Sequence, residues 1–183
     1  MTPIQKPGFS EQTVETPDDF MEAVRARFGF IEWDLAATDR NAKAREYVTK
    51  GRDTFKVDWH RLPRVHGGWL WLNPEYGTPE DPCKDPCTKK RCPVRGWHTD
   101  RYIPGLCDFM GKCAEEGPLG APILALTPLT SADWYRQYVE PFAYTLLLSP
   151  RLKFKGHATL YPKDLALHVY GYGLTGVKSW RWK

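Results

Sequence analysis

The stretch GGWLWLNPEYG, residues 67–77, constrains the fold more than any other part of the chain. Residues 67–72 end in an apolar run without alternation, which is typical of a central strand covered on both faces. The residues NPEY follow directly. In an open sheet flanked by helices, the ligand crevice lies beyond the carboxyl ends of the strands. Their position therefore makes these four residues a candidate site.

Elements after this strand alternate between helix and strand. Helices are expected at 105–117 and 131–139, and strands at 122–128, 143–149 and 165–173. No helix separates the last two strands, so the final strand is expected to be antiparallel, at or near the sheet edge. The alternation predicts an α/β fold with a mostly parallel sheet and helices on both faces.

The first half of the chain gives weaker signals. A helix is expected in TPDDFMEAVRARFGF, with Thr16 as its cap and Gly29 as its stop. Strands are expected at 30–38 and 54–60, with a short helix at 39–48 between them.

The expected organisation is a single domain with one arm and one insertion. Residues 1–15 are polar and are expected to form a mobile N-terminal arm, ahead of a domain spanning 16–183. Residues 77–104 hold five prolines, three cysteines and six cationic residues without periodicity. This composition predicts an irregular, Cys-rich, basic insertion.

Charge is distributed unevenly along the chain, although the net charge is only +4. Residues 1–34 carry a net charge of −4, residues 84–101 one of +4, and residues 149–183 one of +6. Two basic segments on one domain are compatible with DNA or another polyanion as a partner, whereas the simpler interpretation is a solvated surface.

Neither a signal peptide nor a membrane span is apparent in the sequence. The N-terminus has no apolar central region, and no stretch approaches the ~20 apolar residues that a membrane helix needs. The cysteine count of five is odd, which fits a reducing compartment. A cytoplasmic location without membrane contact is therefore expected, whereas the oligomeric state is not indicated.

The insertion contains a ligand set for a metal. Cys83, Cys87, Cys92 and His98 supply three thiols and an imidazole within sixteen residues, as in closed tetrahedral zinc sites. A metal would also order a loop that lacks hydrophobic periodicity. The alternative is a set of free thiols in a flexible loop.

Asn73, Pro74 and Tyr76 suit the methylation of an amino group on a nucleobase. Such an amine is a poor nucleophile, because its lone pair is delocalised into the ring. The Asn73 amide oxygen and the Pro74 carbonyl, accepting from the two amine hydrogens, would free the lone pair for in-line attack on a methyl group. Tyr76 would stack on the base once it has left the duplex. In isolation, the same residues also suit a simple turn.

Taken in order, the motifs TPDDF, WDLAATDRNA, DTFKVDW, WLNPEYG, LTPLTSADWY and RLKFKG resemble those of the phage-type DNA adenine-N6 methyltransferases. The resemblance runs from about residue 14 to residue 172. It implies an abbreviated class I (Rossmann-like) methyltransferase fold, because only 39 positions separate Asp34 from Asn73. It also implies transfer of a methyl group from S-adenosylmethionine to N6 of a flipped adenine, protecting phage DNA from restriction in the host cytoplasm.

Two alternatives stay open at this point. One is methylation of cytosine at N4, or of an amino group in RNA. The other is a catalytically degenerate, zinc-stabilised module that binds nucleic acid. Glu75 motivates the second, because it replaces the second proline of the usual Asn/Asp-Pro-Pro-Tyr motif and adds a carboxylate where an anionic substrate would approach.

The resemblance also implies cofactor-site residues. Thr16 and Pro17 correspond to a segment on the cofactor side, and Asp34 to the acidic contact for the methionine amino group. Asp53 or Asp58 would contact the ribose or the adenine edge of the cofactor. Cationic residues expected to contact DNA are Lys89, Lys90, Arg91 and Arg95 in the insertion, and Arg151 and Lys153 in RLKFKG.

Overall fold

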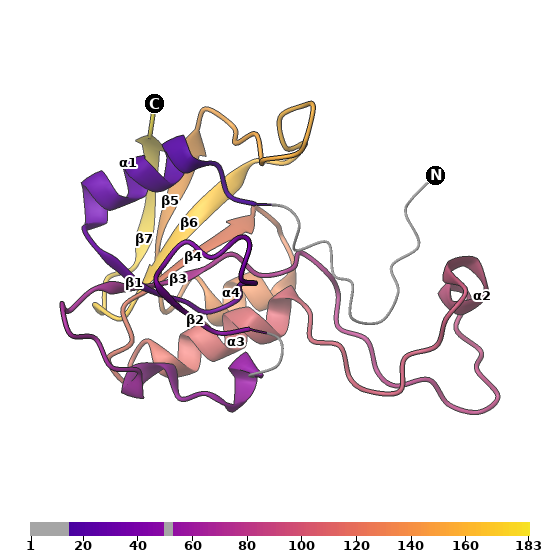
Figure 1. Cartoon of the computed structure of the whole chain (residues 1–183). Coiled ribbons are helices and arrows are strands. Elements are labelled where there is room, and N and C mark those ends of the chain that lie inside the picture. Colours follow the sequence, from indigo (N-terminus) through magenta and orange to yellow (C-terminus); the bar gives the residue numbers. More distant parts are fainter. Residues whose placement is uncertain (1–14, 50–52) are drawn as a thin grey trace.

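The computed structural model describes residues 15–49 and 53–183 (Figure 1). The expected mobile arm lies outside the described residues, except for its last residue. That residue, Glu15, forms an antiparallel bridge with Lys155, so this end of the expected arm is tied to the rest of the chain.

One sheet organises the described part of the chain, and its seven strands lie in the order β2-β1-β3-β4-β6-β5-β7. The strands are β1 (Ile31–Asp34), β2 (Glu46–Tyr47), β3 (Trp69–Leu72), β4 (Ile123–Pro128), β5 (Tyr144–Ser149), β6 (Leu165–Tyr170) and β7 (Gly176–Arg181). All neighbouring pairs are parallel except those of β6, which runs antiparallel to β4 and β5. The sheet is therefore mostly parallel, as expected.

Helices cover both faces of this sheet (Figure 1). The covering helices are α1 (Asp18–Phe28), α3 (Leu106–Glu116) and α4 (Asp133–Tyr138). The short helix α2 (Arg91–Arg95) and the 3-10 turns η1 (Thr54–Lys56) and η2 (Trp59–Arg61) lie in the connections between strands. Helix α1 packs on one face, whereas α3 and α4 pack on the other. The expected α/β arrangement is confirmed.

Strand β3 belongs to both layers of the core. Trp71 packs in the apolar cluster on the α1 side, whereas Leu70 and Leu72 pack in the cluster on the α3 side. All three side chains have no exposed surface. The unbroken apolar run therefore reflects burial on both faces, because alternate residues of a strand point to opposite sides.

The carboxyl-terminal strands correct one expectation. Strand β6 is antiparallel as expected, but it lies between β4 and β5 rather than near an edge, and all six of its residues are buried. It is also not the final strand, because β7 follows and pairs in parallel with β5. Strand β7 gave no clear sequence signal, since five of its six residues are exposed.

Two expectations for the first half of the chain were wrong. The helix expected at 39–48 is a series of turns leading into β2. The Asp34 side chain accepts a hydrogen bond from the Lys43 amide, and the Asn41 side chain accepts one from the amide of Thr38 just before this segment, and both bonds stabilise turns in place of a helix. The strand expected at 54–60 contains η1 and η2 instead, because the Asp53 carboxylate accepts from the Phe55 amide and begins a 3-10 turn.

The insertion at 77–104 is largely irregular, as expected, but it contains the short helix α2 and an antiparallel bridge between Glu80 and Ile103. It extends away from the sheet at the right of Figure 1. Across 15–49 and 53–183, no helix combines the length and apolar character that crossing a membrane would require.

A buried polar contact joins the neighbouring strands β4, β6 and β5. His168 on β6 has no exposed surface, and its ring nitrogens lie 2.8 Å from Thr127 Oγ1 and 2.9 Å from Thr145 Oγ1. Burial lowers the pKa of His168 to about 3, so the ring is neutral at pH 7. A neutral imidazole has one donor and one acceptor nitrogen, which the two hydroxyls match.

We therefore predict that Thr145→Val destabilises the protein. The substitution keeps the shape but leaves one buried ring nitrogen of His168 without its partner, which costs about 1–3 kcal/mol. Thr175→Val, at an exposed position just before β7, is the matched control and should change the free energy of unfolding little. Urea unfolding of both variants measures the difference, and equal stabilities would contradict the role given to the histidine.

Candidate active site

A cavity of about 370 Å³ lies at the carboxyl ends of β1 and β3. Its size is within the range of small-molecule sites. Its lining includes six of the residues singled out in the sequence, namely Thr16, Asp34, Asn73, Pro74, Glu75 and Tyr76. They meet because β1 and β3 are parallel neighbours, with Asp34 opposite Trp71 in the register. Asp34 ends β1 and Asn73 follows β3, so both residues lie on the side of the sheet where the carboxyl ends of these strands meet.

The Asn73 amide is held from two sides. Its Nδ2 donates to Thr16 Oγ1 over 3.1 Å, and its Oδ1 accepts from the Tyr76 hydroxyl over 2.8 Å. Thr16 is buried and does not cap α1 with its side chain, because the cap position is Pro17. The expected helix-capping role is therefore wrong, and the hydroxyl instead orients the Asn73 amide.

Tyr76 lies among aromatic residues from the connection between β5 and β6. Its ring centroid is 6.5 Å from that of Phe154 and 5.8 Å from that of Tyr161, in edge-to-face contacts. Such contacts are favourable for aromatic pairs. Burial raises the pKa of Tyr76 well above its ordinary value, with a smaller contribution from Tyr161, so the hydroxyl is protonated and can donate to Asn73.

Asp34 places a carboxyl group in the wall of the cavity with almost no exposed surface. Its Oδ2 accepts from the Lys43 amide over 2.9 Å, and its Oδ1 accepts from the Ala36 amide over 3.2 Å. Burial raises the pKa of Asp34 from 3.8 to about 6, although the two amides act in the opposite direction. The ionised form is thus under-stabilised, and a cation in the cavity would favour it.

Sequence reasoning missed several residues that line the cavity, among them Glu15, Lys43, His157 and Tyr161. Glu15 Oε1 lies 2.6 Å from Lys43 Nζ and 2.7 Å from Lys155 Nζ. This ion-pair group ties the chain before α1 to segments that are far away in the sequence. No local pattern could have revealed it, because the pairing depends on the fold.

Asp53 and Asp58 are not among the described residues that line the cavity. Both are exposed at the starts of 3-10 turns, where their carboxylates lie 3.9 Å from Lys56 Nζ and 3.4 Å from Arg61 Nη1. Their expected contacts with the cofactor stay predictions.

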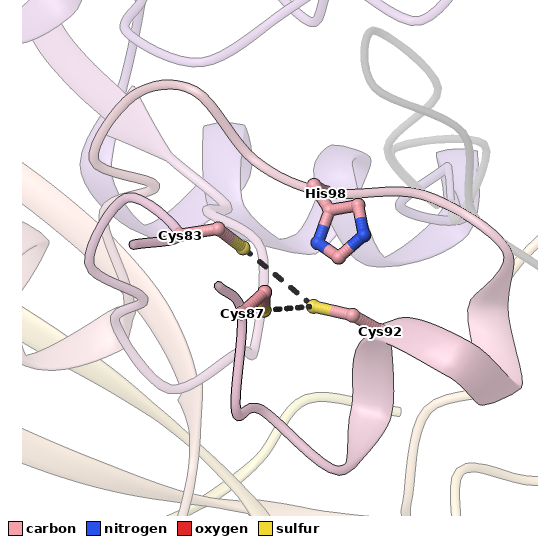
Figure 2. A group of neighbouring side chains, drawn as sticks. All are labelled: Cys83, Cys87, Cys92 and His98. Atoms are coloured by element: carbon pink, nitrogen blue, oxygen red, sulfur yellow. Dashed lines mark hydrogen bonds between the residues drawn. The ribbon is translucent and has the colours of Figure 1, made fainter. Parts of the chain in front are cut away.

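Cys83, Cys87, Cys92 and His98 come together in the insertion, with one ligand atom of each within 4.8 Å of the others (Figure 2). The sulfur of Cys92 lies 3.6 Å from those of Cys83 and Cys87, and all three cysteines are free. Burial would raise the pKa of Cys83, but hydrogen bonds from His98, the Thr99 backbone and the two other thiols lower it to about 6. The four side chains form a group that could hold a metal ion.

The expected DNA-contacting cations differ in their surroundings. Lys89 and Arg91 lie 3.2 Å and 3.3 Å from the buried carboxylate of Glu80. Arg151 lies 2.7 Å from Asp164. Lys90 and Lys153 are exposed, whereas Arg95 is the last residue of α2.

The comparison with known families agrees with this geometry. A family model described as DNA N-6-adenine-methyltransferase (Dam) matches residues 9–154. The chain belongs to this family. The family expected from the ordered motifs is therefore confirmed. No curated protein and no solved structure matches the chain.

Family membership gives the cavity its chemical context. The match covers the chain before α1, strand β1 and the NPEY motif, which supply Thr16, Asp34 and Asn73 to the cavity. The Dam family comprises DNA methyltransferases that act on adenine, so the match implies DNA as the substrate and S-adenosylmethionine as the methyl donor.

We predict a specific pH dependence of stability from Asp34. The pKa of Asp34 is higher in the folded than in the unfolded chain, so the folded chain binds the proton more tightly. The resulting contribution to the free energy of unfolding is fully present below pH 3.8 and is lost as the pH rises through about 6. This gap corresponds to about 3 kcal/mol. Urea unfolding between about pH 4 and about pH 7.5 should show wild type losing stability relative to Asp34→Asn by an amount of this order. Parallel pH curves would contradict it.

Proposed function

We propose that the protein transfers a methyl group from S-adenosylmethionine to the N6 amino group of an adenine flipped out of DNA. The observation that carries the proposal is the Asn73 amide, fixed beside Pro74 in a cavity at the carboxyl end of β3. The family match supports the same reaction.

The residues around Asn73 suggest how the amine would be activated. When bound, S-adenosylmethionine supplies an electrophilic methyl group on a sulfonium sulfur. Asn73 Oδ1 and the Pro74 carbonyl would accept from the two amine hydrogens, which concentrates the lone pair on the nitrogen. That nitrogen would attack the methyl carbon in line as the carbon–sulfur bond breaks, and one amine proton would leave to solvent.

Tyr76 would have two roles in this reaction. Its ring would stack on the flipped base, which must leave the duplex to reach the cavity. Its hydroxyl, however, already donates to Asn73 Oδ1, which is the acceptor that the amine needs. The base would therefore compete with the Tyr76 hydroxyl for the lone pairs of this oxygen.

The cofactor would lie on the Thr16 and Asp34 side of the cavity. Asp34 fits the amino group of the methionine part, because a buried carboxyl with a raised pKa gains from a nearby cation. Perturbed titratable groups in a cavity commonly mark functional sites. Pro17 would act through its neighbour Thr16, as it fixes the start of α1.

The sheet order supports an abbreviated class I methyltransferase fold. In that fold an antiparallel strand is inserted next to the last parallel strand, and β6 between β4 and β5 has this placement. We further propose that 16–183 is one domain, that 77–104 is an insertion carrying a structural zinc ion, and that Lys90 and Lys153 contact DNA as exposed cations.

Glu75 is partly buried and lines the cavity, so its carboxylate belongs to the surface that the substrate meets. It does not replace any group needed to activate the amine, because Asn73, Pro74 and Tyr76 are all present. A phage-encoded enzyme of this kind would act in the host cytoplasm and protect phage DNA from restriction.

The direct test is methylation of unmodified DNA with S-adenosylmethionine, followed by nucleoside analysis. We expect N6-methyladenine from the wild type and none from Asn73→Ala, which removes the amide acceptor. Product at cytosine N4, or only in RNA, would replace the proposed substrate by the alternative one. Normal cofactor binding without any methylated product would reject the enzymatic proposal.

We predict that Tyr76→Phe and Tyr76→Ala have opposite effects. Phenylalanine keeps the stacking ring and removes a hydrogen bond worth about 1 kcal/mol that competes with the substrate, so kcat/KM should rise by up to about fivefold. Alanine removes the ring and should lower kcat/KM by at least about tenfold, given base–aromatic stacking of about 1–3 kcal/mol. Steady-state kinetics on duplex DNA measures both, and an equal loss in the two variants would show that the hydroxyl itself is required.

A further inference from the structure

We infer that Cys83, Cys87, Cys92 and His98 bind one zinc ion, and that this ion holds residues 77–104 as a finger that contacts the DNA backbone beside the target base. The metal assignment is independent of the reaction. The DNA-contacting role rests on the proposed function.

The donor set and its geometry point to zinc. Three thiols and one imidazole are a closed ligand set for a structural zinc ion, which takes four ligands tetrahedrally at about 2.0–2.3 Å. Ligand atoms that surround one zinc ion at these distances lie about 3.3–3.8 Å apart. The sulfur separations of 3.6 Å from Cys92 to Cys83 and Cys87 already meet this requirement, and Figure 2 shows the His98 ring beside the three sulfurs.

The described residues of the insertion form no apolar core that could stabilise it in place of a metal ion. Its buried residues, with the side chain of Arg95 left aside, are Glu80, Cys92 and Thr99. None of these is a large hydrophobic residue, and Val94 is 79% exposed. Four residues that would otherwise be scattered are thus brought to one point by a segment with little hydrophobic driving force. A metal ion supplies folding free energy in such segments.

A second set of contacts, centred on Glu80, connects the metal group to the start of the insertion. Glu80 is buried, pairs through its backbone with Ile103, and lies within 3.3 Å of Arg91 and 3.2 Å of Lys89. Cys92 therefore directly follows a residue that is anchored to the base of the insertion. Loss of the metal would disturb the positions of these cations as well as the loop.

The base of the insertion lies at the rim of the candidate active site. Gly77, which lines the cavity, accepts through its carbonyl from the Leu106 amide over 2.8 Å. The chain thus leaves and re-enters the fold at one point. A Cβ on Gly105 would come within 2.3 Å of the Pro79 nitrogen, so the two arms meet tightly. DNA that delivers a base to this cavity must pass close to the insertion.

The charge of the insertion suits the phosphate backbone. Residues 84–101 carry a net charge of +4, and Lys84, Lys90 and Arg101 are exposed. Lys89 and Arg91 form ion pairs with Glu80, so their charges stabilise the part of the insertion that joins the rest of the fold. Lys84, Lys90 and Arg101 are therefore the cations of the insertion that we expect to contact DNA, whereas the expected contacts of Lys89 and Arg91 stay predictions.

The metal is tested by elemental analysis of the purified full-length chain after zinc supply. We expect one zinc ion per chain in wild type and its loss in Cys83→Ser/Cys87→Ser. The matched control is Cys107→Ser, because Cys107 is a partly exposed free cysteine on α3 outside the group. No zinc in wild type, or equal zinc in all three proteins, would overturn the assignment.

The DNA-contacting role is tested by duplex binding across a salt series, with calorimetry of S-adenosylmethionine binding as a check on the fold. Lys84→Ala/Lys90→Ala should weaken binding and reduce the salt slope by about 0.9 for each phosphate that the variant no longer neutralises. The control, Lys56→Ala/Arg61→Ala, removes the same charge from η1 and η2. Chelation of the zinc should weaken DNA binding while cofactor binding stays. Equal DNA affinity and slope in both double variants would overturn the role.

The two proposals can fail separately. A wild type that binds zinc and DNA but produces no methylated nucleoside would reject the proposed function and would uphold the zinc-held, DNA-contacting insertion.

Discussion

Burial of β3 on both faces is the constraint on which the rest of the structure depends. Leu70, Trp71 and Leu72 fill the two cores at once, so the strand cannot shift in register without exposing large apolar side chains. The position of Asn73 just beyond the strand is therefore fixed by packing. Thr16, 57 positions earlier in the sequence, then sets the orientation of its amide. Rigid placement of a polar group by an apolar strand is what an in-line reaction requires.

The second half of the fold could be predicted because its elements are defined by their own burial. Helix α3 presents an apolar stripe, and β4 and β6 are buried throughout. In the first half, α1, β1 and β3 could also be predicted, but segments 39–48 and 54–60 could not. There Asp34, Asn41 and Asp53 bind backbone amides and stabilise turns where the residue pattern suggested regular elements. The lateral order of the strands also escaped prediction, since chain order does not specify which neighbours β6 pairs with.

The site shows the same division between local and long-range information. Asn73, Pro74 and Tyr76 form one motif, and the metal group lies within sixteen residues, so both could be found by inspection. The contact between Tyr76 and Tyr161, and the ion pairs of Glu15 with Lys43 and Lys155, join segments that only the fold brings together. The hydrogen bond from the Tyr76 hydroxyl to Asn73, on which the proposed competition with the substrate rests, is likewise a property of three-dimensional geometry.

The hydrogen bond between Leu106 and Gly77 has a consequence for protein engineering. Because the two ends of the insertion meet, the length and composition of this segment can change while its two attachment points to the fold stay in place. Such sites accept grafts well, since the host backbone need not move. Insertions of different length can therefore be exchanged on an unchanged sheet, which would alter the proposed DNA-contacting surface without redesign of the cavity.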